Sequence, residues 1–132
     1  MTRQLSAWFP VALATLFIFS LSSQPYTTLF KDVPEASQYL FQRYLQYPAH
    51  LVVYGALTLL WIRALRSHPL TMPGVRRTAL VSVLVTAVLE ELVQFYTPTR
   101  TFALRDLLMD GAGGALAVAV SHRIFPVNSR KS

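Results

Sequence analysis

Residues 78–89 read TALVSVLVTAVL, and residues 90–100 read EELVQFYTPTR. The first stretch holds no charged residue, whereas Glu90 and Glu91 stand side by side directly after it. Proline cannot donate a backbone hydrogen bond into the preceding turn, so Pro98 must end the helix that these stretches predict. A long apolar helix therefore carries two carboxylates in its last turns. Either the helix leaves the apolar environment there, or the carboxylates have a role inside it.

The composition of the whole chain indicates a membrane protein. Of its 132 residues, 53% are hydrophobic and only 14% are charged, and the mean hydropathy is +0.40. Ordinary soluble domains carry about 25% charged residues. The length fits a single domain over residues 1–132. The net charge of +6 comes from basic residues between apolar runs rather than along one face, so nucleic acid is not an expected partner. Without cysteine the chain forms no disulfide, thiolate nucleophile or Cys-ligated metal site.

Four apolar runs approach the length of about 20 residues that a spanning helix needs. They cover residues 7–21, 49–65, 75–96 and 102–125. The sequence therefore predicts an all-α membrane protein built as a four-transmembrane-helix bundle. The first run also resembles a signal peptide, but no A-x-A cleavage site ends it and three further apolar runs follow.

The basic residues of the loops and tails predict the orientation, because Lys and Arg are enriched on the cytoplasmic side. Eight of the twelve lie on the side of the two termini, and four lie on the other side. The first group is Arg3, Arg63, Arg66, Arg76, Arg77, Arg123, Arg130 and Lys131; the second is Lys31, Arg43, Arg100 and Arg105. Both termini are therefore predicted in the cytoplasm, with the chain in the bacterial inner membrane.

The first outer loop is longer than a hairpin between two spans requires. Apolar and tyrosine residues recur there at helical spacing, at Val33, Ala36, Leu40, Tyr44 and Tyr47. This stripe predicts a short helix in the outer headgroup region. A loop packed over the mouth of the bundle is the alternative.

Polar residues gather near the outer ends of the last three predicted spans. Glu91 lies about 9 Å along its helix from the turn around Pro98, and Asp106 lies at a similar distance on the descending helix. Gln94 shares a helix face with either adjacent glutamate. Those glutamates diverge by about 100°, so at most one is expected to point fully into the bundle. Glu91 is assigned to that role, while Glu90 is equally well explained by extension toward lipid headgroups.

Two further pairs have the i, i+4 spacing that places residues on one helix face. They are His50 with Tyr54, and Asp106 with Asp110. A charge at the bilayer centre costs about 2.5–3.5 kcal/mol. The carboxylates are therefore expected to face inward, to be partly protonated, or to pair with Arg100 or Arg105.

Neither a cofactor nor a metal is predicted. One histidine beside carboxylates is weak support for a metal site. The GAGGA stretch at residues 111–115 follows no strand and lacks the last glycine of a dinucleotide-binding loop. Its small residues, with Gly111, Gly113 and Ala115 as the predicted contacts, instead favour close packing between helices.

The ordered set His50-x3-Tyr54, Glu91-x2-Gln94-x3-Pro98-x-Arg100 and Asp106-x3-Asp110-x2-Gly113 resembles the VanZ-like family of small bacterial membrane proteins. The chain departs from the family pattern at residues 46–47, where an Asp-Lys pair is common, and at Asp110 and Ala117, which replace an asparagine and a glycine. The resemblance implies an integral protein of the cell envelope. The family is named for a protein associated with resistance to teicoplanin, a glycopeptide with a lipid tail, and it implies no established reaction.

Three hypotheses for the function remain. In the first, a polar site of His50, Tyr54, Glu91, Gln94, Arg100, Asp106 and Asp110 engages an envelope lipid or a lipid-tailed compound in the outer leaflet. In the second, the chain is a structural or assembly subunit whose protein partners are unknown. In the third, it is an enzyme on an envelope lipid with a carboxylate or His50 as general base. The third is ranked last because the sequence shows no evident nucleophile.

Overall fold

The computed structural model describes residues 2–126. In chain order the helices are α1 (Thr2–Ser22), α2 (Tyr26–Leu29), α3 (Glu35–Leu40), the π-helical turn η1 (Phe41–Leu45), α4 (Gln46–Leu65), α5 (Met72–Tyr96) and α6 (Leu104–Ile124). This part of the chain contains no strand. The all-α prediction is confirmed.

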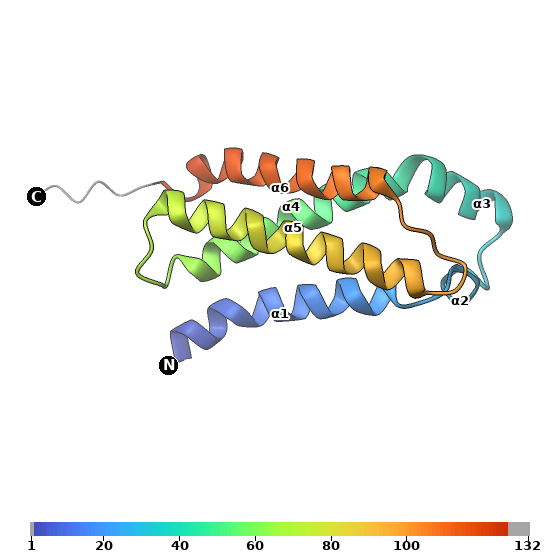
Figure 1. Cartoon of the computed structure of the whole chain (residues 1–132), viewed down its shortest axis with the longest axis horizontal. Helices are drawn as coiled ribbons and strands as arrows, with labels where there is room; N and C mark the ends of the chain where they lie inside the picture. The colour runs from blue at the N-terminus through green and yellow to red at the C-terminus, as the bar shows by residue number, and fades with distance from the viewer. Residues whose placement is uncertain (1, 127–132) are drawn as a thin grey trace, which may run out of the picture.

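The four long helices, α1, α4, α5 and α6, lie along one another and alternate in direction (Figure 1). The start of α1 and the end of α6 lie at one end of the bundle, and α2 and α3 lie at the other. The most extensive helix contact joins α4 and α6. Among the described residues, α1 packs against α4 and α5 but not against α6.

Three helical stretches are long and apolar enough to cross a membrane. They are Gln4–Ser22, Glu35–Leu65 and Met72–Tyr96. Helix α6 has a comparable length but is not one of the three. Its first two turns carry Arg105, Asp106 and Asp110, and polar residues there lower its hydropathy.

The region of the predicted interfacial helix is helical, but it is not separate from the second span. Helix α3 runs through η1 directly into α4, and Figure 1 shows α3 extending beyond the end of the four-helix bundle. Val33, Leu40 and Tyr44 of the predicted stripe are exposed. Phe41 lies against Phe30 with ring centroids 5.5 Å apart, which attaches this segment to the loop after α2.

The ends of α5 follow from local sequence. Thr71 precedes the helix, and its side chain accepts a hydrogen bond from the backbone N–H of Gly74, as an N-cap does. The helix ends at Tyr96, just before Pro98, as predicted. Thr99 then has a φ of 64°, which is unusual for a β-branched residue. Its hydroxyl accepts a hydrogen bond of 3.0 Å from the N–H of Tyr26, so this turn is tied to α2.

Small side chains on α6 allow its close contact with α4, although not all the predicted residues take part. A Cβ on Gly113 would overlap the carbonyl group of Leu51 and lie 3.1 Å from the amide nitrogen of Gly55. Gly111 instead faces Leu84 of α5. Ala115 is exposed, so its predicted packing role is wrong. The buried residues of α6 follow the helical period and are Asp106, Asp110, Gly113, Gly114, Ala117 and Ser121.

Candidate functional site

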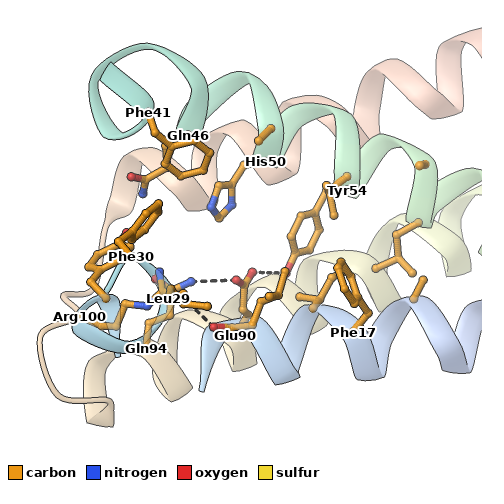
Figure 2. A pocket seen from close by; sticks show the side chains of 18 of the residues that line it. Phe17, Leu29, Phe30, Phe41, Gln46, His50, Tyr54, Glu90, Gln94 and Arg100 are labelled. Atoms are coloured by element: carbon orange, nitrogen blue, oxygen red, sulfur yellow. Dashed lines mark hydrogen bonds between the residues drawn. The ribbon is translucent and has the colours of Figure 1, made fainter. Parts of the chain in front are cut away.

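A cavity of about 500 Å³ opens between α1 and α4 (Figure 2). One part of its wall is apolar and includes Phe17, Val53 and Leu57. The other part is polar, with Gln46, His50, Tyr54, Glu90, Gln94 and Arg100. These polar residues belong to the first turns of α4, the last turns of α5 and the following loop. The cavity is therefore amphipathic along its length.

Glu90 is the centre of the hydrogen-bond network at the polar end. It is only 5% exposed. Its carboxylate accepts hydrogen bonds from the hydroxyl of Tyr54, the amide of Gln94 at 2.8 Å and the hydroxyl of Ser22. Figure 2 shows Tyr54 and Gln94 converging on this carboxylate. Three helices, α1, α4 and α5, are thus joined through one side chain.

The structure corrects the assignment of the two glutamates. Glu91 is fully buried, but it does not line the cavity. One of its oxygens accepts a 2.7 Å hydrogen bond from the backbone N–H of Ala103, just before α6, and the other has no partner. Both glutamates point into the protein because α5 packs against α1, α4 and α6. Glu90 contacts α1 and α4, whereas Glu91 contacts the residue before α6. An angle of about 100° between adjacent residues is then no obstacle to burying both.

His50 joins α4 to the two aspartates of α6. Its Nδ1 lies 2.9 Å from Oδ1 of Asp110, and its Nε2 lies 3.7 Å from Oδ2 of Asp106. Both aspartates are fully buried, and each has one oxygen without a hydrogen-bond partner. The amide of Gln46 donates a 2.8 Å hydrogen bond to Oδ2 of Asp106. The i, i+4 pairs predicted on α4 and α6 therefore face each other.

Arg100 does not pair with a carboxylate among the described residues, which corrects the predicted ion pair. Its guanidinium donates hydrogen bonds to the carbonyl oxygens of Leu21 at 2.9 Å and Gln24 at 3.2 Å. It also lies over the ring of Tyr26, 4.2 Å from the centroid. Arg100 thus binds carbonyl oxygens at and just after the end of α1, and it forms part of the cavity wall. Arg105, the other predicted partner, is exposed.

Three residues of the polar network were not predicted as site residues. Gln46 had a detectable signal, because it precedes His50 by four positions and so shares the face of His50 and Tyr54. Glu90 had no such signal, because a carboxylate that extends toward lipid headgroups and one that points into the bundle give the same sequence pattern. Ser22 had none either, because only the packing of α1 against α5 brings it to Glu90.

The family model of VanZ/LLP1 matches residues 7–125, which is most of the chain. The chain belongs to the VanZ/LLP1 family. This confirms the family resemblance inferred from the motifs on α4, α5 and α6. No match was found among the curated proteins or among the solved structures. Family membership and the apolar helices together show a membrane protein.

Behind the cavity wall of this VanZ/LLP1 protein, buried carboxylate oxygens remain without hydrogen-bond partners. Tyr54 and Gln94 already donate to Glu90, while carboxylate oxygens of Asp106 and Asp110 behind His50 remain without partners. The hydroxyl of Ser22 is also bonded to Glu90, and Ser22 does not line the cavity. The unpaired acceptors thus belong to Asp106 and Asp110, while the Glu90 carboxylate is fully engaged by Tyr54, Gln94 and Ser22.

Proposed function

We propose that this protein crosses the inner membrane four times and binds an envelope lipid, or a lipid-tailed compound such as teicoplanin, in the cavity between α1 and α4. The observation that carries the proposal is the division of the cavity into an apolar part and a polar end. An amphipathic molecule satisfies both: its hydrocarbon tail contacts Phe17 and Val53, and its polar part meets His50 and Glu90.

The fourth span of this proposal is α6. Its 21 residues have a length of about 31 Å, close to the hydrocarbon thickness of about 30 Å. Its exposed basic residues Arg105 and Arg123 lie in its first and last turns, and its carboxylates, Asp106 and Asp110, are buried against the bundle. Leu104, Leu108 and Leu116 are exposed instead. Lipid would therefore contact an apolar surface of α6 despite its charged residues.

The orientation proposed for these spans has both termini in the cytoplasm. Within the described residues, the basic side chains Arg63, Arg66, Arg77 and Arg123 are exposed in the part of the chain around the α4–α5 connection and the end of α6. The predicted contributions of Arg130 and Lys131 lie outside the described residues. With this orientation the polar end of the cavity belongs to the outer leaflet, since α4 begins there and α5 ends there. The exposed stripe of α3 and η1 is then at the level of the outer headgroups.

The test compares two valine-to-tryptophan substitutions, one inside the cavity and one outside it. Val53 lines the cavity and is 43% exposed, whereas Val88 of α5 is 44% exposed and does not line it. Val53→Trp fills part of the cavity, and Val88→Trp adds the same side chain to a surface outside it. Native mass spectrometry of gently purified protein is expected to show a bound lipid in the wild type and in Val88→Trp, and much less in Val53→Trp. Teicoplanin added to delipidated protein serves as the second probe.

Two results would contradict the proposal. Equal lipid retention in the two variants would show that the lipid is bound elsewhere on the surface. No specific lipid and no teicoplanin binding in the wild type would favour a structural or assembly subunit, in which the polar network only holds the helices together.

A further inference from the structure

The bundle around the polar end of the cavity contains more buried negative charge than the surrounding side chains compensate. Glu90 is 5% exposed, and Glu91, Asp106 and Asp110 are fully buried. Within residues 2–126, the only side chain that forms an ion pair with any of them is His50. Burial of an unpaired charge is costly, so such a group either takes up protons or holds a cation.

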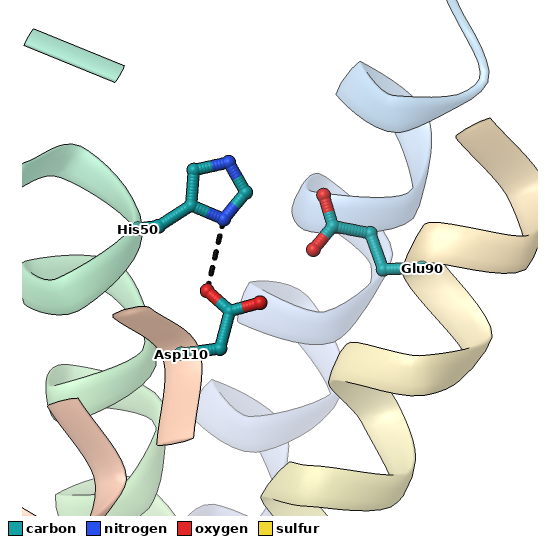
Figure 3. Close-up of side chains that lie close together, drawn as sticks. All are labelled: His50, Glu90 and Asp110. Atoms are coloured by element: carbon teal, nitrogen blue, oxygen red, sulfur yellow. Dashed lines mark hydrogen bonds and ion pairs between the residues drawn. The ribbon is translucent and has the colours of Figure 1, made fainter. Parts of the chain in front are cut away.

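Three of these side chains converge from three helices (Figure 3). Each offers one ligand atom, and these three atoms lie within 4.8 Å of one another. The side chains are His50 of α4, Glu90 of α5 and Asp110 of α6. Oδ2 of Asp110 is buried without a hydrogen-bond partner. Figure 3 shows this second oxygen on the side of Asp110 that faces Glu90. An unpartnered buried acceptor is therefore aimed into the space between the three groups.

We propose that His50, Glu90 and Asp110 bind one divalent transition-metal ion, with zinc or manganese as the fitting class. One imidazole nitrogen and two carboxylate oxygens form a ligand set that suits these ions, whereas magnesium and calcium prefer oxygen ligands alone. In the tetrahedral geometry of zinc, ligand atoms at about 2.0–2.2 Å from the ion lie roughly 3.3–3.6 Å apart. The three side chains, whose atoms lie within 4.8 Å of one another, therefore have to close in by roughly 1.5 Å at most. His50 and Glu90 also line the cavity, so the remaining coordination positions face its interior.

Residues next to the three ligands can hold His50 in the orientation that metal binding requires. A metal-binding histidine usually donates its other ring N–H to a carboxylate, which sets the orientation of the ring. If Nδ1 binds the ion beside Asp110, Nε2 faces Oδ2 of Asp106 at 3.7 Å. Gln46 in turn holds that oxygen with a 2.8 Å hydrogen bond. Asp106 is thus a positioning residue for His50 rather than a ligand.

The experiment measures metal bound to the full-length protein in detergent. The protein is stripped with EDTA, incubated with zinc or manganese, desalted and analysed by elemental mass spectrometry and by thermal melting. We expect about one ion per chain and a higher melting temperature with zinc or manganese, but not with equal magnesium or calcium. Glu90→Gln and Asp110→Asn keep the size of the side chains and are expected to weaken binding at least tenfold. Glu91→Gln is the matched control, a buried carboxylate of the same region outside the ligand set, and it should retain the ion.

Either of two results overturns the proposal. In the first, the folded wild-type protein retains no zinc or manganese, and neither ion changes its melting temperature. This result would show that protons alone balance the charge of the carboxylates. Equal metal content in the wild type, Glu90→Gln and Asp110→Asn would mean that the ion is adventitious. The metal measurements use no lipid, so their outcome is independent of the lipid-binding proposal.

Discussion

Gly113 of α6 packs on the backbone of α4 beside Gly55, and each glycine leaves room for the other helix. A Cβ on Gly113 would lie 3.1 Å from the amide nitrogen of Gly55, and a Cβ on Gly55 would lie 3.3 Å from the carbonyl oxygen of Gly113. This contact brings α4 and α6 close enough for His50 to reach Asp110. Helix packing and the polar site therefore depend on the same two glycines.

We expect Gly113→Ala to lower thermal stability in detergent and Gly113→Leu to abolish most folded protein. The added carbon meets backbone atoms of α4, which cannot move aside without separating the helices, and overpacking of this kind costs about 1–3 kcal/mol or more. Melting temperature and the monodisperse peak in size-exclusion chromatography measure the effect. Ala115→Leu is the control, because Ala115 is exposed two positions away. Normal stability of Gly113→Leu would contradict the packing described above.

Tyr54→Phe is expected to destabilise the bundle because it removes a hydrogen-bond donor from buried Glu90. A buried acceptor that loses its partner costs about 1–3 kcal/mol. The size of the side chain is otherwise preserved, so packing around residue 54 should change little. Thermal melting in detergent measures the loss. Tyr96→Phe serves as the comparison, since Tyr96 is 81% exposed, and an equal effect in both variants would rule out a specific role for the Tyr54 hydroxyl.

Arg100→Lys should reduce stability even though it keeps the charge. The arginine fork bonds two carbonyl oxygens at the end of α1 and lies on the ring of Tyr26, and an ammonium group does not reproduce this geometry. The expected result is a lower melting temperature than that of Arg105→Lys, in which an exposed arginine changes in the same way. Equal melting of the two variants would show that the guanidinium contacts contribute nothing measurable.

Glu91→Gln and Arg100→Gln are expected to be additive in a double-mutant cycle. Glu91 accepts its hydrogen bond from Ala103, whereas Arg100 bonds to Leu21 and Gln24, so the two side chains share no partner. Independent sites add within about 0.5 kcal/mol. A coupling energy well above that value, read from melting in detergent, would show that Glu91 and Arg100 interact and would contradict the contacts described above.

Reporter fusions test the proposed orientation. A reporter that is active only in the cytoplasm should work at the C-terminus and fail in the turn at Pro98. A reporter that is active only outside should give the reverse pattern. The expectation follows from the eight basic residues on the side of the termini against four on the other side. Outside activity at both positions would show that α6 does not span, and outside activity at the C-terminus alone would show that the bundle is inverted.

The sequence by itself determined the helical class, the approximate helices and the faces within each helix. Long apolar runs have few alternatives to a helix in a membrane, because every backbone polar group must be bonded internally there. The i, i+4 spacing placed His50 with Tyr54 and Asp106 with Asp110 on common faces, and those faces do meet. The same motifs were sufficient to recognise the VanZ/LLP1 family.

Only the tertiary structure decided which neighbour each of these faces meets. Glu90 rather than Glu91 reaches the cavity, Arg100 bonds to the end of α1, and Gly113 packs beside Gly55 while Ala115 stays exposed. Helical periodicity relates residues of one helix to each other, but it does not specify how that helix is rotated against its partners. The rotation follows from the packing of distant segments, such as Ser22 of α1 against Glu90 of α5. Local spacing carries no information about such contacts.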